Sequence, residues 1–257
     1  MFLADFHIHS NFSDGQLSIP ELIDLYGQRN FGAIAITDHL CEEKTWLGMT
    51  AQVLQRTLTR QSFPDYMALI AEERVRAWEQ YGMVVLAGFE LTKNSLLHHR
   101  SAHLLGIGVS DYIAADGDVF ELAQAIKHQG ALCVAAHPLP TGKLELQTRH
   151  LWDRRKELGP LIDAWEVGSG DNWFKEVAQS GLPALASSDL HIPRQLTSWK
   201  TVLDCERHPE AILQAIRQQN LSCIYYQDRQ AESILPLLSP FEATGPLMTD
   251  EHLVCTA

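Results

Sequence analysis

Two histidines near the N-terminus, His7 and His9, follow an apolar run over residues 2–6 and are separated by one residue. On a β-strand this spacing directs both imidazoles to the same face. Neutral imidazole is a common nitrogen ligand for Zn, Fe, Mn and Ni, so the pair could bind one cation. Asp14, in the Ser-Asp-Gly turn that follows, could add a carboxylate oxygen. The alternative is a surface strand with two solvated histidines.

Side chains of the same chemical type occur where later apolar runs end. The runs over residues 33–39, 83–91, 132–138 and 182–191 are short and nearly continuous, which is typical of buried strands in a parallel sheet. The residues at or near their ends are His39, Glu90, His137, Asp189 and His191. His103 differs from these, because it begins the apolar run 103–109 instead of ending one.

Amphipathic stretches between the runs predict the helices that position these strands. The expected helices cover residues 18–29, 42–82 with a break near 62–65, 116–129, 144–158, 172–179 and 209–219. Ser18 and Glu21 have the spacing of a capping box at the start of the first helix. Strand and helix alternate about seven times, which predicts a parallel α/β architecture.

An open sheet and a closed barrel both fit this alternation, and the positions of the candidate ligands favour the barrel. The ligands come from at least five strands, nearly all from the C-terminal ends. A barrel assembles its active site from several strand ends at that face, whereas an open sheet concentrates its site at one switch point. No repeat or linker divides the chain, so we expect one barrel domain over residues 1–230 and a docked or frayed tail over 231–257.

Composition limits the function classes. The chain has 257 residues and a net charge of −12, which argues against a large basic surface for nucleic acid. No apolar run approaches the roughly 20 residues that cross a bilayer, and no secretory signal is visible. The five cysteines are scattered without Cys-x-x-Cys spacing, as is typical of reduced thiols. These features predict a cytoplasmic protein that does not bind a membrane.

Seven short motifs carry a resemblance to a known family. They are His7-Ile8-His9-Ser10, Ser13-Asp14-Gly15, Ile36-Thr37-Asp38-His39, Gly88-Phe89-Glu90, His103-Leu104-Leu105-Gly106, Ala136-His137-Pro138 and Ser188-Asp189-Leu190-His191. In this order they resemble the PHP (polymerase and histidinol phosphatase) family. The resemblance implies a single distorted (β/α)7 TIM-like barrel with a two- or three-metal site at the C-terminal face of the strands. Family members include phosphomonoesterases, nucleases and modules of bacterial polymerases.

The resemblance also implies how nine residues divide among the metals. The first ion would take His7, His9, Glu90 and Asp189; the second Glu90, His103 and His137; the third Asp14, His39 and His191. Among these ligands, Glu90, Asp189 and His191 are the expected catalytic residues. The mixed nitrogen and oxygen donors suit Zn, Mn or Fe, and the sequence does not choose among them.

Residues around the ligands have less specific signals. Asp5 and Asp38 adjoin ligands in sequence and could orient imidazoles, or be ordinary strand-end carboxylates. Arg194, three residues after His191, is the first candidate for binding a phosphoryl group, because guanidinium can do so with two hydrogen bonds. Lys200 and Arg100 are the other candidates for contact with substrate. The alternative for all three cations is a solvated surface charge.

The resulting hypothesis is a metal-dependent phosphoesterase that hydrolyses a small phosphomonoester by in-line attack of a metal-bridging hydroxide. A nuclease or phosphodiesterase and a metal-binding module without turnover are the alternatives. The stretch 39–90 is long for the AMP-phosphatase-like branch, and 103–137 leaves no room for the lid domain of that branch. The natural substrate, the oligomeric state and a lid role for residues 40–82 therefore stay open.

Overall fold

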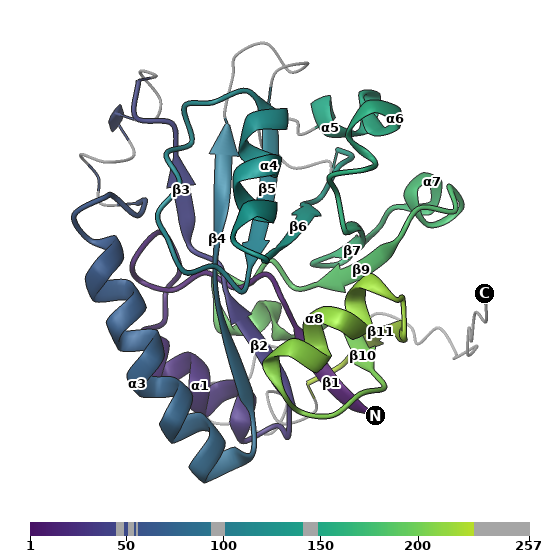
Figure 1. Cartoon of the computed structure of the whole chain (residues 1–257). Helices are drawn as coiled ribbons and strands as arrows, with labels where there is room; N and C mark the ends of the chain where they lie inside the picture. The colour runs from purple at the N-terminus through teal and green to yellow at the C-terminus, as the bar shows by residue number, and fades with distance from the viewer. Residues whose placement is uncertain (45–48, 51–53, 55, 94–100, 141–148, 229–257) are drawn as a thin grey trace, which may run out of the picture. The chain divides into compact units, whose positions relative to one another are not determined.

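The computed structural model describes residues 1–44, 49–50, 54, 56–93, 101–140 and 149–228 (Figure 1). In this part of the chain eleven strands form one mixed sheet. They are β1 (Phe2–Asp5), β2 (Ala33–Ile36), β3 (His39–Cys41), β4 (Val84–Lys93), β5 (Ala102–Ile107), β6 (Leu132–Ala135), β7 (Ala164–Ser169), β8 (Asn172–Trp173), β9 (Ala184–Ser187), β10 (Ser198–Leu203) and β11 (Leu221–Tyr226). One compact unit spans Met1–Gln227, and the tail expected over 231–257 lies outside the described residues.

The sheet runs in the order β11-β10-β1-β2-β4-β5-β6-β7-β8, with β3 paired to β4 and β9 paired to β7. The segments that follow β1 and β9 also pair with each other. Ile8 and Leu190 form a parallel bridge, in which the amide of His9 donates to the carbonyl of Leu190 at 2.9 Å. The result is a curled mixed sheet, a half-barrel, which is consistent with the distorted barrel expected from the sequence.

The prediction of a parallel sheet is wrong at several strands. β10 is antiparallel to β1 and β11, β8 is antiparallel to β7, and β5 is antiparallel to its neighbours within the curl. β1, β2 and β4 are parallel, as are β6, β7 and β9, but β5 is antiparallel to both β4 and β6. An antiparallel strand begins at the edge where its neighbours end. His103, at the start of β5, therefore lies at the same edge of the sheet as the C-terminal ends of β4 and β6.

β2 and β3 both pair with β4 in parallel, and Thr37 and Asp38 separate the two paired stretches. Residues 33–36 pair with 84–87, and after the break His39 lies directly opposite Glu90. Thr37 uses its hydroxyl to accept a hydrogen bond from the amide of Ile8 at 3.0 Å. This hydrogen bond connects the residue after β2 to the segment that follows β1. The pairing of β3 with β4 then places His39 beside Glu90.

Both faces of β2, β4, β5 and β6 are buried, as the continuous apolar runs predict, whereas β11 is partly exposed. Along β2, Ile34 and Ile36 belong to one apolar cluster, whereas Ala33 and Ala35 belong to the other. Helices α1 (Ile19–Gly27) and α3 (Phe63–Tyr81) pack on each other and add side chains to the first cluster (Figure 1). Helix α8 (Pro209–Arg217) adds side chains to the second cluster. The strands are thereby fixed along their length, while their ends remain available for polar side chains.

The helices are α1 (Ile19–Gly27), α3 (Phe63–Tyr81), α4 (Val119–His128), α5 (His150–Asp153), α6 (Arg155–Leu158), α7 (Lys175–Ala178), the 3-10 helix η2 (Pro193–Leu196) and α8 (Pro209–Arg217). In α1 the carboxylate of Glu21 accepts a hydrogen bond from the amide of Ser18 at 2.8 Å, as the sequence predicts. No helix in the described ranges is both long and apolar enough to cross a membrane.

The helix expected over 42–62 is wrong for residues 56–62, which form turns and bends. Thr57 and Leu58 instead contact β3: the Thr57 hydroxyl accepts from the amide of Cys41, and the amide of Leu58 donates to the carbonyl of His39 at 2.7 Å. Pairing with a strand takes the backbone groups that a helix would need. The helix therefore begins only at Phe63.

Candidate metal centre

The structure brings together the nine side chains that the sequence proposes as metal ligands. Their nitrogen and oxygen atoms form four overlapping groups, and within each group the atoms lie within 4.8 Å of one another. The groups are His9, Asp14, His39 and His191; His7, His137 and Asp189; His7, His9 and Glu90; and Glu90, His103 and His137. These residues come from the ends of β1, β3, β4, β5, β6 and β9 and the loops that follow them.

Glu90 lies at the centre and its two oxygens face different histidines. Its Oε1 is 2.7 Å from His103 Nδ1 and 3.3 Å from His137 Nε2. Its Oε2 is 3.5 Å from His7 Nε2 and 3.6 Å from His9 Nε2. The Glu90 side chain is fully buried. This arrangement fits a carboxylate that is shared between two adjacent cations.

Two aspartates complete the cluster on the other side of His9. Asp189 Oδ1 lies 3.4 Å from His7 Nε2 and 3.3 Å from His9 Nε2. Asp14 Oδ1 lies 3.3 Å from His191 Nε2. The four groups differ in part from the expected division among three ions. Asp189 groups with His7 and His137 instead of with His9 and Glu90, and His9 also joins the group of Asp14, His39 and His191.

The backbone is strained at two of the candidate ligands. His137 has φ 24° and Asp189 has φ 52°, in the region that residues with a side chain seldom adopt. Such a conformation costs on the order of 1–3 kcal/mol and persists only where surrounding contacts impose it. The amide of His137 donates to Glu166 Oε2 at 2.7 Å, and the carbonyl of Asp189 accepts from His191 Nδ1 at 3.0 Å. Strain of this kind is typical of functional sites.

Several buried polar atoms in the cluster have no hydrogen-bond partner among the described residues. They are His7 Nε2, both ring nitrogens of His9, Asp14 Oδ1 and Glu90 Oε2. Leaving a buried polar atom unpaired costs about 1–3 kcal/mol, so a group of them at one place requires an explanation. Imidazole nitrogens and carboxylate oxygens are the donors that Zn, Mn and Fe take. The residues present therefore fit divalent metal ions.

The electrostatics of the site keep its carboxylates ionised. Burial opposes ionisation of Glu90, but the imidazoles of His39 and His103 hold the pKa of its carboxyl well below the usual range. Burial lowers the pKa of His9 to about 3, with the neighbouring His191 adding to the effect. Ionised carboxylates and a neutral His9 are the protonation states that metal binding requires.

Glu166, on β7, is a functional candidate that the sequence analysis missed. Its Oε1 lies 3.0 Å from His7 Nδ1 and its other oxygen accepts from the backbone of His137, with the side chain fully buried. A carboxylate that accepts the second ring N–H of a metal-binding histidine fixes the direction of that ring. The available signal was a single charged residue inside the otherwise apolar run 164–168.

Asp5 and Asp38 do not orient imidazoles, so that expectation is wrong. Asp38 accepts hydrogen bonds from the hydroxyls of Ser10 at 2.6 Å and Ser13 at 2.5 Å. Asp5 accepts from the hydroxyl of Tyr26 at 2.7 Å. Asp38 therefore holds the loop that carries Asp14, and Asp5 belongs to the interior of the sheet.

The proposed contacts to substrate have different outcomes. Lys200 is fully buried, with its Nζ 3.2 Å from Asp5 Oδ2, so a direct contact with substrate is wrong for this residue. β10 lies between β1 and β11, which encloses the side chain. Arg194 is exposed on η2, three residues after His191. Arg100 lies outside the described residues.

We expect Glu166→Gln to lower metal affinity about 10- to 100-fold, because Gln keeps the size of the side chain but removes the charge that orients His7. Metal content after dialysis against graded chelator would measure the change. Glu176→Gln is the control, since Glu176 bonds Trp152 on the outside of the sheet. Equal metal retention in all three proteins would show that Glu166 does not support the site.

We expect Gly15→Ala to destabilise the loop that carries Asp14. A Cβ at Gly15 would lie 2.1 Å from the carbonyl oxygen of His9, and a backbone atom cannot move aside. Overpacking of this kind costs about 1–3 kcal/mol. At Gly117 the nearest atom to a new Cβ is a flexible Glu121 side-chain oxygen at 3.2 Å, so Gly117→Ala is the control. Urea denaturation of the two variants measures the difference, and equal midpoints would contradict the prediction.

Comparison with known proteins identifies the family of this chain. The sequence profile described as PHP domain matches residues 5–136, about half of the chain. No curated protein sequence matches the chain.

Two solved structures illustrate the fold likeness. One is a two-domain protein from Bacteroides vulgatus containing a predicted PHP-like metal-dependent phosphoesterase, with a TM-score of 0.62 and 21% identity. The alignment covers 88% of this chain and 65% of that protein, so this chain spans less than two-thirds of its length. The other is PsfC from Pseudomonas syringae, with a TM-score of 0.57, 17% identity and coverage of 91% and 94% of the two chains. At these identities the likeness shows a shared fold, and the profile match shows that this chain belongs to the PHP domain family.

Proposed function

We propose that the protein is a metal-dependent phosphoesterase that hydrolyses a small phosphomonoester. The observation that carries the proposal is the cluster around Glu90, with its unpaired buried nitrogen and oxygen atoms. Membership of the PHP domain family supports it, and the Bacteroides vulgatus relative is described as containing a PHP-like metal-dependent phosphoesterase. The finer architecture that we propose is a distorted (β/α)7 barrel, closed where Ile8 meets Leu190.

We propose that the cluster holds two or three ions of Zn, Mn or Fe, with Glu90 shared between ligand groups. When bound, such ions lower the pKa of water and neutralise charge on a phosphoryl group, which would supply both the nucleophile and the electrostatic stabilisation. The protein fixes the positions of the donors: Glu90 and Asp189 supply the negative charge, and Glu166 holds the ring of His7. No separate carboxylate base is required for such a reaction.

The exposure of the ligands indicates where substrate would enter. His7, His9 and Glu90 are fully buried, whereas the side chains of His191 and Asp14 are 26% and 25% exposed. His191 and Asp14 are the most exposed of the nine candidate ligands, so we expect a phosphoryl group to reach the cluster from their side. On that side, His191 would hold the cation that is nearest to the leaving group of the substrate.

The test combines elemental analysis with a screen for phosphate release. Purified protein is loaded with Mn, Zn or Fe and assayed against phosphomonoesters, phosphodiesters and single-stranded nucleic acid. We expect metal-dependent release from a small phosphomonoester, and Asp189→Ala should remove both metal and turnover while the protein stays folded. Turnover of only nucleic acid would favour a nuclease, and bound metal without any turnover would favour a metal-binding module; either result would overturn the proposal.

A further inference from the structure

Two oxygens lie close to the Nδ1 atom of His39, and only one of them forms a hydrogen bond with it. Thr92 Oγ1 lies 2.8 Å from this nitrogen and has the geometry of a hydrogen bond. Glu90 Oε2 lies 2.7 Å from the same nitrogen, yet this oxygen has no hydrogen-bond partner among the described residues. The ring of His39 is therefore directed at Thr92, which leaves Glu90 Oε2 available to a cation.

The Thr92 hydroxyl also determines which ring nitrogen of His39 carries the hydrogen. A hydroxyl has one hydrogen to donate, and that of Thr92 is donated to the backbone carbonyl of Glu90 at 3.1 Å. The Thr92 oxygen must then accept from His39, so the hydrogen of the neutral ring is on Nδ1. The lone pair is on Nε2, which lies 3.6 Å from Asp14 Oδ1. Thr92 thus directs the ligand atom of His39 toward Asp14.

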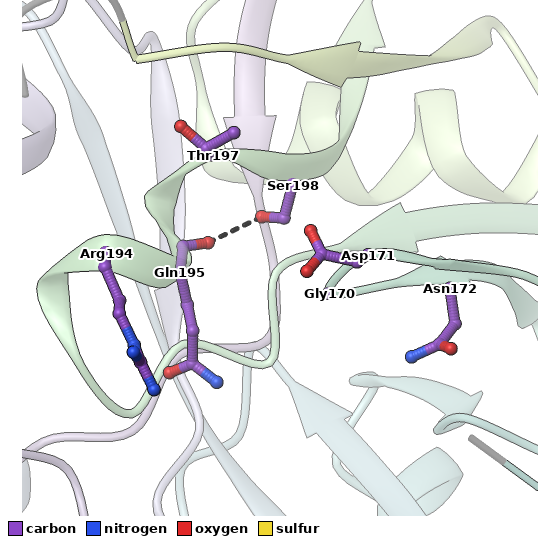
Figure 2. Close-up of a pocket in the computed structure, with 7 residues that line it drawn as sticks. All are labelled: Gly170, Asp171, Asn172, Arg194, Gln195, Thr197 and Ser198. Carbon is purple, nitrogen blue, oxygen red and sulfur yellow. Dashed lines mark hydrogen bonds between the residues drawn. The ribbon is translucent and has the colours of Figure 1, made fainter. Parts of the chain in front are cut away.

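His191 presents its own Nε2 to the same carboxylate oxygen. Its Nδ1 donates to the carbonyl of Asp189 at 3.0 Å, and its Nε2 lies 3.3 Å from Asp14 Oδ1. Gln195 accepts a hydrogen bond from the backbone amide of His191 at 2.7 Å through its side-chain oxygen. Figure 2 shows Gln195 on η2, where its backbone carbonyl accepts from the Ser198 hydroxyl at 2.7 Å. The backbone of His191 is therefore anchored to η2, and its ring is oriented by a neutral oxygen.

One of the four ligand groups contains the most exposed of the nine candidate ligands, and we call it the outer group. Its members are His9, Asp14, His39 and His191. The Nδ1 atoms of His39 and His191 donate to neutral oxygens, whereas Nδ1 of the buried His7 lies 3.0 Å from the carboxylate of Glu166. A carboxylate partner increases the basicity of an imidazole ligand. In the outer group the partners of these two rings supply orientation without a negative charge.

We infer that Thr92 is a positioning residue for the cation of the outer group. The inference rests on the proposed function, because it takes the cluster as a metal centre. His39 belongs to the outer group alone, so a change in its ring affects that group and not the others. The backbone of His39 is already fixed, since its carbonyl accepts from the Leu58 amide at 2.7 Å. Without the hydroxyl, the Nδ1–H loses its acceptor in this orientation, and the ring turns Nε2 away from Asp14.

The experiment measures metal retention in protein that is loaded with Mn, dialysed against graded chelator and examined by elemental analysis. Thr92→Val removes the hydroxyl and keeps the shape of the side chain. It should lower the affinity for one Mn ion per chain about 10- to 100-fold and leave retention of the other Mn as in the wild type. Thr92→Ser keeps a hydroxyl and should retain Mn like the wild type. Thr201→Val is the control, since Thr201 is also buried and its hydroxyl bonds to Ala186.

A second ligand of the outer group identifies which ion is lost. His191→Ala should lose the same ion as Thr92→Val, so the double variant should retain as much Mn as His191→Ala alone. In the phosphate-release assay, Thr92→Val should need about 10- to 100-fold more free Mn for its half-maximal rate. Excess Mn should restore its kcat, because a positioning residue changes the affinity of the site and not the reaction. Circular dichroism establishes that each variant is folded.

The outcomes separate this inference from the proposed function. Equal Mn retention in Thr92→Val and the wild type would overturn the inference and leave the phosphoesterase in place, as would an equal loss in Thr92→Ser or Thr201→Val. Further loss of Mn in the double variant would assign Thr92 to a different ion, which also overturns it. Loss of one Mn in Thr92→Val, in a protein that hydrolyses no phosphoester, would support the inference and overturn the proposed function. Absence of Mn, Zn and Fe binding by the wild type would overturn both.

Discussion

Glu90→Gln is expected to abolish metal-dependent phosphate release and to lower the metal content of the purified protein by more than one ion. The reason is the shared position of the carboxylate, whose two oxygens face His7 and His9 on one side and His103 and His137 on the other. An amide supplies no negative charge to offset adjacent cations, and its nitrogen cannot act as an acceptor. Replacing a ligand of only one ion would leave the other groups intact.

The control for this variant is Glu73→Gln. Glu73 is also buried, but it lies on α3 and pairs with Arg76 away from the cluster. Elemental analysis and phosphate release are measured for both variants, with circular dichroism to establish that they are folded. Full activity of Glu90→Gln, or loss of metal in Glu73→Gln to the same extent, would show that Glu90 does not link the ligand groups.

Lys200→Met is expected to destabilise the protein by about 3–5 kcal/mol, because it removes one partner of a buried ion pair and leaves the other uncompensated. Lys200 and Asp5 are both fully buried, with 3.2 Å between Nζ and Oδ2. Burial lowers the pKa of Lys200, while the charge of Asp5 opposes this change. Tyr26 and Ser188 also donate to Asp5, so they offset part of the loss.

Urea denaturation of the metal-free protein measures this effect without involving turnover. The double variant Asp5→Asn, Lys200→Met should recover part of the stability, since it removes the isolated charge as well. Lys175→Met, on the exposed surface of α7, should leave the midpoint unchanged. A normal midpoint for Lys200→Met together with a raised KM would instead restore the role in substrate binding that the sequence suggested.

The sequence predicts the convergence of the candidate ligands because strand ends are readable from it. Short apolar runs that end in His, Asp or Glu define both a strand and the edge at which its last residue lies. His39, Glu90 and Asp189 lie together for this reason. The place of His103 could not be predicted from its position in the apolar run alone. Whether a strand runs parallel or antiparallel depends on its neighbours, and the sequence pattern is the same in either case.

The contacts that support the candidate ligands could not be predicted, because residues that are neighbours in sequence point in different directions. Asp38 precedes His39, yet its carboxylate bonds to Ser10 and Ser13, whereas His39 lies opposite Glu90. Glu166 lies 159 residues from His7 in sequence, and only the tertiary fold brings them together. Lysine is usually a surface residue, and the burial of Lys200 follows from the position of β10 between β1 and β11.

The bridge between Ile8 and Leu190 has a consequence for how the chain reaches its native state. The hydrogen bond from the Ser188 amide to Asp5 joins residues separated by 183 positions, and the bond from the Ser188 hydroxyl to the His7 carbonyl spans 181. Contacts of such high sequence separation form late, because a long loop must close before they stabilise anything. During synthesis, Asp189 and His191 leave the ribosome long after His7 and His9. His7 and His9 therefore lack these partners until most of the domain has been made, so the proposed ligand set is completed only late in folding.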